Sequence, residues 1–400
     1  MMLVKEKSDV SKMTGLILLL LILFVGCGEN TTNITYEPDE EEEENEQVQG
    51  EPSSLSGAYE GMFKIGVALN SSQVYGDSPE ATPLITKHFN TATPENLLKW
   101  TSTHPQPDQY TFDGSDQFVD FAEQRDMFIV GHTLVWHSQI PDWTFLDDNG
   151  DELGREALLQ RMKDHIDTVV GRYKGRVDAW DVVNEAATWS DGLRQSKWLE
   201  IIGEDYLDKA FQYAHEADPD AELYYNDYNL WASGKRQTVV DMVKRLQENG
   251  VPIHGIGMQT HLGIDGPSIE EIEASIEAFS ALGVKVMITE LDVNVLPSED
   301  DVNVDYDPDS GETVPSELNP FTNGLPDYMQ QMLKDRYVEL FELFKKHQEK
   351  IDRVTFWGLD DGHTWLNGFP IPNRTNHPLL FDRDYEPKPA LFGILDVAEN

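Results

Sequence analysis

Short apolar runs alternate with longer amphipathic segments along most of this chain, and this alternation limits the fold more than any other feature. Eight apolar runs have the length of buried strands, namely residues 63–67, 88–91, 127–132, 177–183, 223–226, 253–259, 284–289 and 354–357. Segments of helical period lie between them, namely residues 118–125, 158–173, 206–217, 235–249, 269–282 and 327–348. Strands that alternate with helices favour a parallel sheet with helical crossover connections.

Eight such units in about 340 residues predict a single α/β domain with the (β/α)8 architecture of a TIM barrel. A doubly wound sheet is the alternative, and it is weakened because no glycine-rich phosphate-binding turn follows the first apolar run. We find no internal repeat and no second domain in the sequence. The acidic stretch 297–326, rich in Pro, Asn and Gly, is interpreted as a large loop after the seventh strand, which either reshapes the binding surface or is a solvated insertion.

The first residues have the composition of an export signal. Lys5, Lys7 and Lys12 precede an unbroken apolar run over residues 16–25, which is too short to span a bilayer. The only cysteine, Cys27, ends the string LFVGC, which resembles a bacterial lipoprotein cleavage box. We predict a lipoprotein signal peptide over residues 1–27 and lipidation of Cys27, so that the exported protein is anchored to the outer membrane or cell surface. The alternative is an ordinary secretory signal, with an incidental cysteine and a secreted protein.

Residues 28–57 are predicted to form an acidic, disordered linker, followed by a catalytic domain over residues 58–400. The linker has ten acidic residues and no Lys or Arg, so it repels itself and cannot pack. The whole chain has 30 Lys and Arg against 73 Asp and Glu. This balance excludes sequence-independent binding of nucleic acid, because a phosphate backbone would repel such a surface.

Two of the predicted strands end in a glutamate. The fourth ends in WDVVNEA, with Asn184 and Glu185 at its tip, and the seventh ends in MITELDV, with Glu290 at its tip. In a (β/α)8 barrel the active-site residues follow the strands on the C-terminal face, and strands four and seven lie on roughly opposite sides of the ring. Two facing carboxylates there can hydrolyse a glycosidic bond. Either glutamate alone is equally compatible with a salt bridge at a strand end.

The other strand ends carry amides, imidazoles and aromatic rings, which suit sugar hydroxyls and pyranose faces. In chain order these residues are Glu95, Asn96, Lys99, Trp100, His132, Trp136, His137, Tyr225, Asn226, Tyr228, Gln259, His261, Trp357 and Trp365. Gln259 and His261 alternate along their strand, so both side chains point the same way.

These strings resemble glycoside hydrolase family 10, the retaining endo-β-1,4-xylanases, over about residues 58–400. The motifs WDVVNEA, ITELDV, FNTATPENLLKW, GHTLVWH and TFWGLDDGHTWL occur in the order and spacing of that family. The string DDGHTWLNGFPIP resembles members from Bacteroidetes-like bacteria. The sequence departs from the family pattern in the 297–326 loop and in Leu97 and Leu98, which stand between the PEN and KW pieces.

The resemblance implies a role for each matching residue. It implies that Glu185 is the general acid/base and that Glu290 is the nucleophile of a double displacement, with carboxyl groups roughly 5–5.5 Å apart. It implies a sugar-binding set comprising Glu95, Asn96, Lys99, His132, Trp136, Asn184, Gln259, His261, Trp357 and Trp365. Trp357 and Trp365 would supply the bulk that rejects the hydroxymethyl group of glucose. Tyr228 is added to the predicted set as a polar aromatic residue at a strand end.

The predicted reaction is hydrolysis of internal β-1,4 linkages of xylan, without a cofactor or a metal ion. The predicted partners are xylan and xylo-oligosaccharides, with no nucleic acid, and a membrane only through the lipid anchor of a monomer. A non-catalytic carbohydrate-binding lipoprotein and a β-1,4-glucanase on a related barrel are the alternatives. A metal-dependent hydrolase is disfavoured because the eleven histidines include no His-x-His pair, and a serine hydrolase because G-x-S-x-G is missing. No loop motif supports a calcium site.

Overall fold

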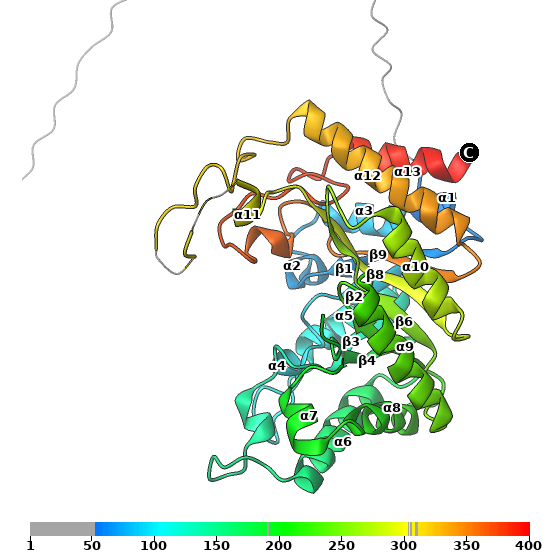
Figure 1. The fold of residues 1–400 in the computed structure, drawn as a ribbon, viewed down its shortest axis with the longest axis vertical. Helices are drawn as coiled ribbons and strands as arrows, with labels where there is room; N and C mark the ends of the chain where they lie inside the picture. The colour runs from blue at the N-terminus through cyan, green and yellow to red at the C-terminus, as the bar shows by residue number, and fades with distance from the viewer. Residues whose placement is uncertain (1–52, 190–191, 303, 305, 309–310) are drawn as a thin grey trace, which may run out of the picture. The chain divides into compact units, whose positions relative to one another are not determined.

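A computed structural model describes residues 53–400 except 190–191, 303, 305 and 309–310 (Figure 1). The predicted signal peptide, Cys27 and residues 28–52 of the predicted linker lie outside the described residues. The linker was predicted to reach residue 57, and this boundary is wrong by a few residues. Helix α1 (Leu55–Ala58) belongs to the folded domain, because Leu55 is completely buried in its core.

Eight parallel strands close into a barrel, which confirms the predicted TIM barrel. They are β1 (Lys64–Leu69), β2 (Thr91–Pro94), β3 (Phe128–Val135), β4 (Ala179–Asn184), β5 (Glu222–Asp227), β6 (Gly255–Met258), β8 (Lys285–Asn294) and β9 (Ile351–Phe356). Neighbours in the ring follow chain order, and β1 pairs with β9. The short strand β7 (His261–Gly263) pairs with the last residues of β8.

Helices surround this barrel, and all but the first and those after β9 lie between consecutive strands in the chain (Figure 1). The long ones are α3 (Ala81–His88), α5 (Asp113–Glu123), α6 (Arg155–Arg172), α8 (Tyr206–Ala217), α9 (Ser233–Glu248), α10 (Ile269–Ser280), α12 (Asp327–Lys346) and α13 (Pro389–Glu399). The short ones are α2 (Ser71–Tyr75), α4 (Trp100–Thr103), α7 (Lys197–Ile202), α11 (Glu299–Val302) and the 3-10 turns η1 (Asp142–Phe145) and η2 (Trp365–Asn367). Among the described residues, no helix combines the length and apolarity needed to cross a membrane.

The second strand and the last helix differ from the sequence prediction. The second strand was predicted at residues 88–91, but His88 ends α3 and the strand begins at Thr91. A short run of residues does not show whether it forms the buried end of a helix or a buried strand, because both can have the same composition. Helix α13 was not predicted because it is apolar on nearly all sides, since it packs between α12 and α1.

In the core between the barrel and its helices, a large side chain packs against a glycine. Trp180 on β4 is completely buried and lies against Gly131 on the neighbouring β3. A Cβ atom at position 131 would lie 2.2 Å from Cε3 of Trp180, so only glycine fits there. Inside the barrel, Ala179, Tyr224 and Met287 form a separate buried group, so side chains also fill its centre.

Buried histidines add a pH-sensitive element to the core. His104 and His165 face each other with their Nδ1 atoms 3.2 Å apart, and His165 stacks on Trp100 with ring centroids 3.5 Å apart. Burial, opposed by Asp108 and assisted by Arg161, lowers the pKa of His104 to about 4. Burial, with a smaller contribution from Lys87, lowers the pKa of His88 to about 4.

We expect the free energy of unfolding to fall as the pH drops from 6.5 towards 4. The unfolded chain binds protons on these histidines near pH 6.5, whereas folded His88 and His104 resist protonation until about pH 4, so protons favour unfolding. Each histidine lowers the free energy of unfolding by at most about 1.4 kcal/mol for each pH unit. In urea titrations, His88→Leu should lose less stability than the wild type between pH 7 and pH 5. An equal loss in both proteins would contradict this account.

Candidate active site

Two glutamates lie on the C-terminal side of the barrel. Glu185 directly follows β4, and its φ of +59° lies in the left-handed region, which costs a non-glycine residue on the order of 1–3 kcal/mol and is typical of functional sites. Glu290 lies within β8, because this strand continues to Asn294, whereas the sequence predicted its end at residue 289. The extension exists because β7 pairs with residues 292–294.

Three side-chain amides connect the two carboxylates. Asn226 Nδ2 donates to Glu290 Oε1 at 2.7 Å, and Gln259 Nε2 donates to Glu185 Oε1 at 3.0 Å. The amide of Asn184 lies between them, 3.0 Å from Asn226 Nδ2 and 3.2 Å from Gln259 Nε2. Glu185 and Glu290 therefore belong to one hydrogen-bonded cluster, although they come from strands far apart in the sequence.

The orientation of Asn226 is set by its neighbours. Thr289 Oγ1 donates to Asn226 Oδ1 at 2.6 Å, so the NH2 end of the amide is directed at Glu290. Gly257, on the strand between them, leaves the necessary space, because a Cβ atom there would lie 2.4 Å from Asn226 Oδ1. A side chain at position 257 would thus displace the amide that holds Glu290.

His261 lies between Glu290 and a second buried carboxylate. Its Nε2 is 3.1 Å from Glu290 Oε2, and its Nδ1 is 3.0 Å from Asp292 Oδ1. Burial acts to lower the pKa of this imidazole, but Asp292 and Glu290 outweigh burial and raise the pKa to about 10. His261 is therefore a cation at neutral pH and compensates the charge of Glu290. Trp365 Nε1 donates to the other oxygen of Asp292 at 2.8 Å.

Lys99 supplies a second buried cation. Its Nζ donates to Asn96 Oδ1 at 3.0 Å and to Gln139 Oε1 at 2.7 Å, and lies 5.0 Å from the ring centroid of Trp136. Burial lowers the pKa of Lys99, and the charges of Glu290, Glu95 and Glu185 oppose this shift. Burial also raises the pKa of the Glu95 carboxyl, against the opposing charge of Lys99.

The other predicted aromatic and imidazole residues occupy the same end of the barrel. His132 Nδ1 is 2.9 Å from Asp181 Oδ2, with both side chains buried, which fixes the imidazole. The ring of His132 lies edge-on to Trp357, with centroids 5.3 Å apart. Trp365 lies 4.9 Å from the ring of His261.

Basic groups surround the backbone of Glu185. Arg194 Nε donates to the carbonyl oxygen of Glu185 at 3.0 Å, and its Nη2 donates to the hydroxyl of Tyr228 at 2.7 Å. Lys235 lies 3.5 Å from the ring centroid of Tyr228 and forms a buried ion pair with Asp227 at 2.7 Å. Tyr228, predicted to bind substrate, is therefore held by two cations beside Glu185.

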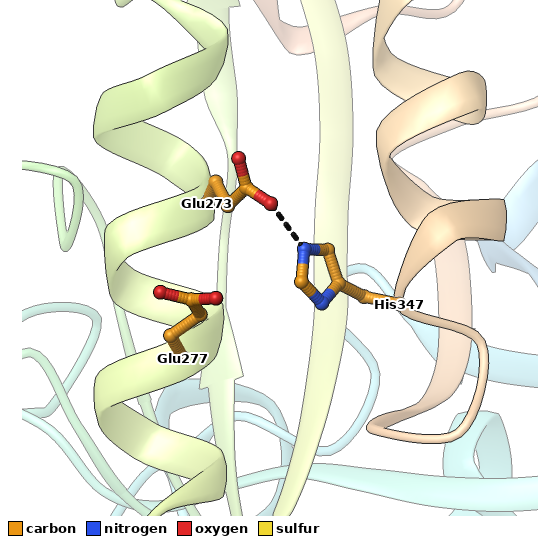
Figure 2. A group of neighbouring side chains, drawn as sticks. All are labelled: Glu273, Glu277 and His347. Carbon is orange, nitrogen blue, oxygen red and sulfur yellow. Dashed lines mark hydrogen bonds and ion pairs between the residues drawn. The ribbon is translucent and has the colours of Figure 1, made fainter.

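One group of metal-ligating side chains lies outside this site, on the surface helices. Glu273 and Glu277 of α10 face His347, which follows α12 (Figure 2). His347 Nε2 lies 2.5 Å from Glu273 Oε1, and Lys346 Nζ lies 2.6 Å from the same oxygen. The lysine already neutralises this carboxylate, so the cluster is explained as an ion-paired contact between the helices. The absence of a metal requirement stays a prediction.

The structure thus brings two carboxylates, several amides and several indoles together at one end of the barrel, and comparison with known proteins identifies the family. The sequence matches the model of Glycosyl hydrolase family 10 over residues 54–397. The chain belongs to this family. It is 46% identical over 344 residues to endo-1,4-beta-xylanase A of Xylanibacter ruminicola, covering 84% of this chain and 91% of that protein.

Solved family 10 structures resemble this one closely. A GH10 endoxylanase from a sugarcane soil metagenome has a TM-score of 0.82 at 46% identity, covering 87% of this chain and all of that one. Xylanase XynB of Paenibacillus barcinonensis, complexed with a conduramine derivative, has a TM-score of 0.77 at 42% identity. That match covers 86% of this chain and 98% of the other.

Several residues of this family 10 site were missed in the sequence. Asp292 was detectable, because it stands two residues after Glu290 and strand alternation puts both side chains on one face. Thr289, the residue that orients Asn226, gives no such signal, because strand alternation predicts that its side chain points away from that of Glu290, yet both contact Asn226. Gln139 and Arg194 come from loops, where no periodicity indicates the direction of a side chain.

We expect Asp292→Asn to weaken the ion pair of His261 without removing a group that touches substrate. Loss of the Asp292 charge lowers the pKa of His261. Each pKa unit by which it falls corresponds to about 1.4 kcal/mol less stabilisation of the charged imidazole by its neighbours. The imidazole then deprotonates at lower pH, so activity is lost earlier on the alkaline side. NMR titration of the imidazole and the pH profile of kcat measure both effects, with exposed Asp384→Asn as the control. An unchanged titration of His261 would contradict the assignment.

Proposed function

We infer that this chain is a retaining endo-1,4-β-xylanase that hydrolyses internal linkages of xylan by double displacement. The observation that carries this inference is the hydrogen-bonded cluster that joins Glu185 and Glu290 through Asn184, Asn226 and Gln259. Membership of family 10, with relatives named as endo-1,4-beta-xylanases at 41–46% identity, supports the substrate class.

In the first half of the reaction, the carboxylate of Glu290 attacks the anomeric carbon of a xylose unit. The bond from this carbon to the glycosidic oxygen breaks, and Glu185 gives its proton to that oxygen. In the second half, Glu185 takes a proton from water, and the water oxygen attacks the same carbon. The ester bond to Glu290 breaks, and the product keeps the configuration of the substrate.

The neighbours of Glu290 prepare it for attack. His261 supplies a positive charge at Oε2, and Asn226 supplies a neutral donor at Oε1. Together they hold the carboxylate ionised at a buried position and fix its direction before substrate arrives. Because Asn226 and His261 are themselves held by Thr289 and Asp292, the nucleophile need not reorganise during the reaction.

The remaining predicted residues bind the sugar on either side of the broken bond. The polar side chains near Lys99 donate to and accept from hydroxyls of the glycone, while Trp136 and His132 line the same part of the site. Trp357 and Trp365 lie against His132 and His261 and limit the space beyond the xylose ring. This bulk disfavours a hydroxymethyl group and hence cellulose.

Removing either carboxylate should abolish turnover of polymeric xylan. Glu185→Ala loses the proton donor, a contribution of about 10²–10⁴ in rate, but should still bind xylo-oligosaccharides. Glu290→Ala should be inactive until azide enters the vacated space, and it should then release product of inverted configuration. Reducing ends released from xylan and from carboxymethyl-cellulose measure the activity. An active Glu185→Ala variant would disprove the assignment, and faster hydrolysis of the cellulose by wild type would indicate a glucanase.

We also propose that the protein is an exported lipoprotein from a Bacteroidetes-like bacterium, with the barrel held outside the cytoplasm on the 28–52 segment. The basic start, the short apolar run and Cys27 support this proposal. Its monomeric state and its independence of nucleic acid stay predictions.

Lipidation of Cys27 should decide where the full-length chain partitions. With diacylglyceryl attached, the exported protein enters the detergent phase of Triton X-114, because two chains suffice for stable anchoring. Cys27→Ala should instead remain unprocessed or enter the aqueous phase. Labelling with radioactive palmitate gives an independent readout, and an unlabelled wild-type protein in the aqueous phase would contradict the anchor.

A further inference from the structure

A buried phenol lies behind the segment that carries Glu185. By sequence, Tyr225 is one of the strand-end residues that suit a sugar, but its side chain is completely buried in the core between the barrel and its helices. Asn226, the next residue of β5, points to the opposite side and donates to Glu290. Tyr225 therefore does not touch substrate, and its hydroxyl has a different role.

The hydroxyl of Tyr225 makes three hydrogen bonds. Its oxygen accepts from the backbone N–H groups of Ala186 and Ala187, at 3.0 Å each. Its hydrogen is donated to Oδ2 of Asp227. A phenol has one hydrogen to donate and two lone pairs with which to accept, so these contacts use its whole capacity. Tyr225 is thus part of the turn that follows Glu185.

The peptide group that joins Glu185 to Ala186 is held at both of its ends. Its carbonyl oxygen accepts from Arg194 Nε at 3.0 Å, and its N–H donates to the hydroxyl of Tyr225. The N–H of Glu185 itself donates to the carbonyl oxygen of Asn226 at 2.9 Å. These contacts fix the two peptide planes on either side of Glu185. They hold it at a φ of +59°, which is disfavoured for a residue with a side chain.

The carboxylate of Asp227 determines which way the hydroxyl of Tyr225 points. Its Oδ2 accepts from that hydroxyl and from the N–H of Ala187 at 3.2 Å. Its Oδ1 accepts from the N–H of Tyr228 at 2.9 Å and pairs with Lys235 Nζ at 2.7 Å. Both carboxylate oxygens therefore accept, and the phenol hydrogen is drawn away from the two backbone amides that need its oxygen.

We propose that Tyr225 is a positioning residue for the general acid/base, because its hydroxyl keeps the Glu185 carboxyl directed at the glycosidic oxygen. The inference rests on the proposed function. Without this hydroxyl, the buried N–H of Ala186 loses its partner, and the peptide group after Glu185 rotates to find another. The rotation moves the carboxyl, and a displacement of about 1 Å is enough to weaken a catalytic group strongly.

The test compares a substrate that needs the acid with one that does not. A phenyl β-xylobioside has a poor leaving group and depends on protonation by Glu185, whereas 2,4-dinitrophenolate leaves without a proton. We expect Tyr225→Phe to lower kcat/KM for the phenyl substrate about ten-fold, a part of the 10²–10⁴ that a general acid contributes. The value for the dinitrophenyl substrate should hardly change. The ratio of the two values is independent of the fraction of folded enzyme.

The second half of the reaction gives an independent readout. Glu185 there takes a proton from water, so Tyr225→Phe should also lower kcat for the dinitrophenyl substrate. Azide attacks the ester without a base and should restore this kcat. Asp227→Asn should give the same pattern, because the NH2 end of an asparagine faces hydrogen-bond donors in either orientation. This variant decides the question if Tyr225→Phe does not fold.

Tyr224→Phe is the matched control. Tyr224 precedes Tyr225 on β5, is equally buried and also donates to a carboxylate, that of Glu222, but it belongs to the buried group inside the barrel. Its ratio should equal that of the wild type. An unchanged ratio for Tyr225→Phe, or an equal loss of kcat/KM on both substrates, would overturn the positioning role. Failure of the wild type to release reducing ends from xylan would instead reject the proposed function itself.

Discussion

The site depends on holding a buried carboxylate in its charged form. Glu290 is only 5% exposed, and an unpaired charge at such a position is strongly disfavoured. The imidazolium of His261 on one oxygen and the amide of Asn226 on the other replace the lost solvent. Asp292 keeps the imidazole protonated, so Glu290 is one member of a chain of alternating charges.

The barrel meets this requirement through its strands. Asn226 lies on β5 and Glu290 on β8, and Gln259 directly follows β6, the strand between them. The hydrogen bonds between these neighbouring strands therefore set the spacing of the three side chains. Gly257 removes the side chain that would displace the Asn226 amide. The pairing of β7 with β8 places His261 opposite Asp292. A parallel closed sheet thus produces rigid polar geometry at one of its ends.

The sequence predicts the barrel, and it places the two glutamates and the predicted sugar-binding residues at strand ends, which converge in this fold. The sequence does not predict the residues that hold the site side chains in place, and the reasons are physical. Lys235 looks like a surface lysine in the first turn of an amphipathic helix, yet it is buried against Asp227. Arg194 is placed by its contact with Tyr228, which directly follows β5, and no local pattern encodes this contact. The start of β2 was misplaced because a run as short as residues 88–91 does not distinguish the end of a helix from a strand.

The most direct test of this account is to trap the covalent intermediate. A 2-deoxy-2-fluoro-xylobioside with a good leaving group reacts with the nucleophile of a retaining enzyme and leaves a slowly hydrolysed ester, which mass spectrometry locates in a proteolytic digest. We predict a single added xylobiosyl group on the peptide that contains Glu290, and on Glu290 within it. A label on any other residue, or rapid hydrolysis with inverted configuration and no trapped ester, would contradict the central claim.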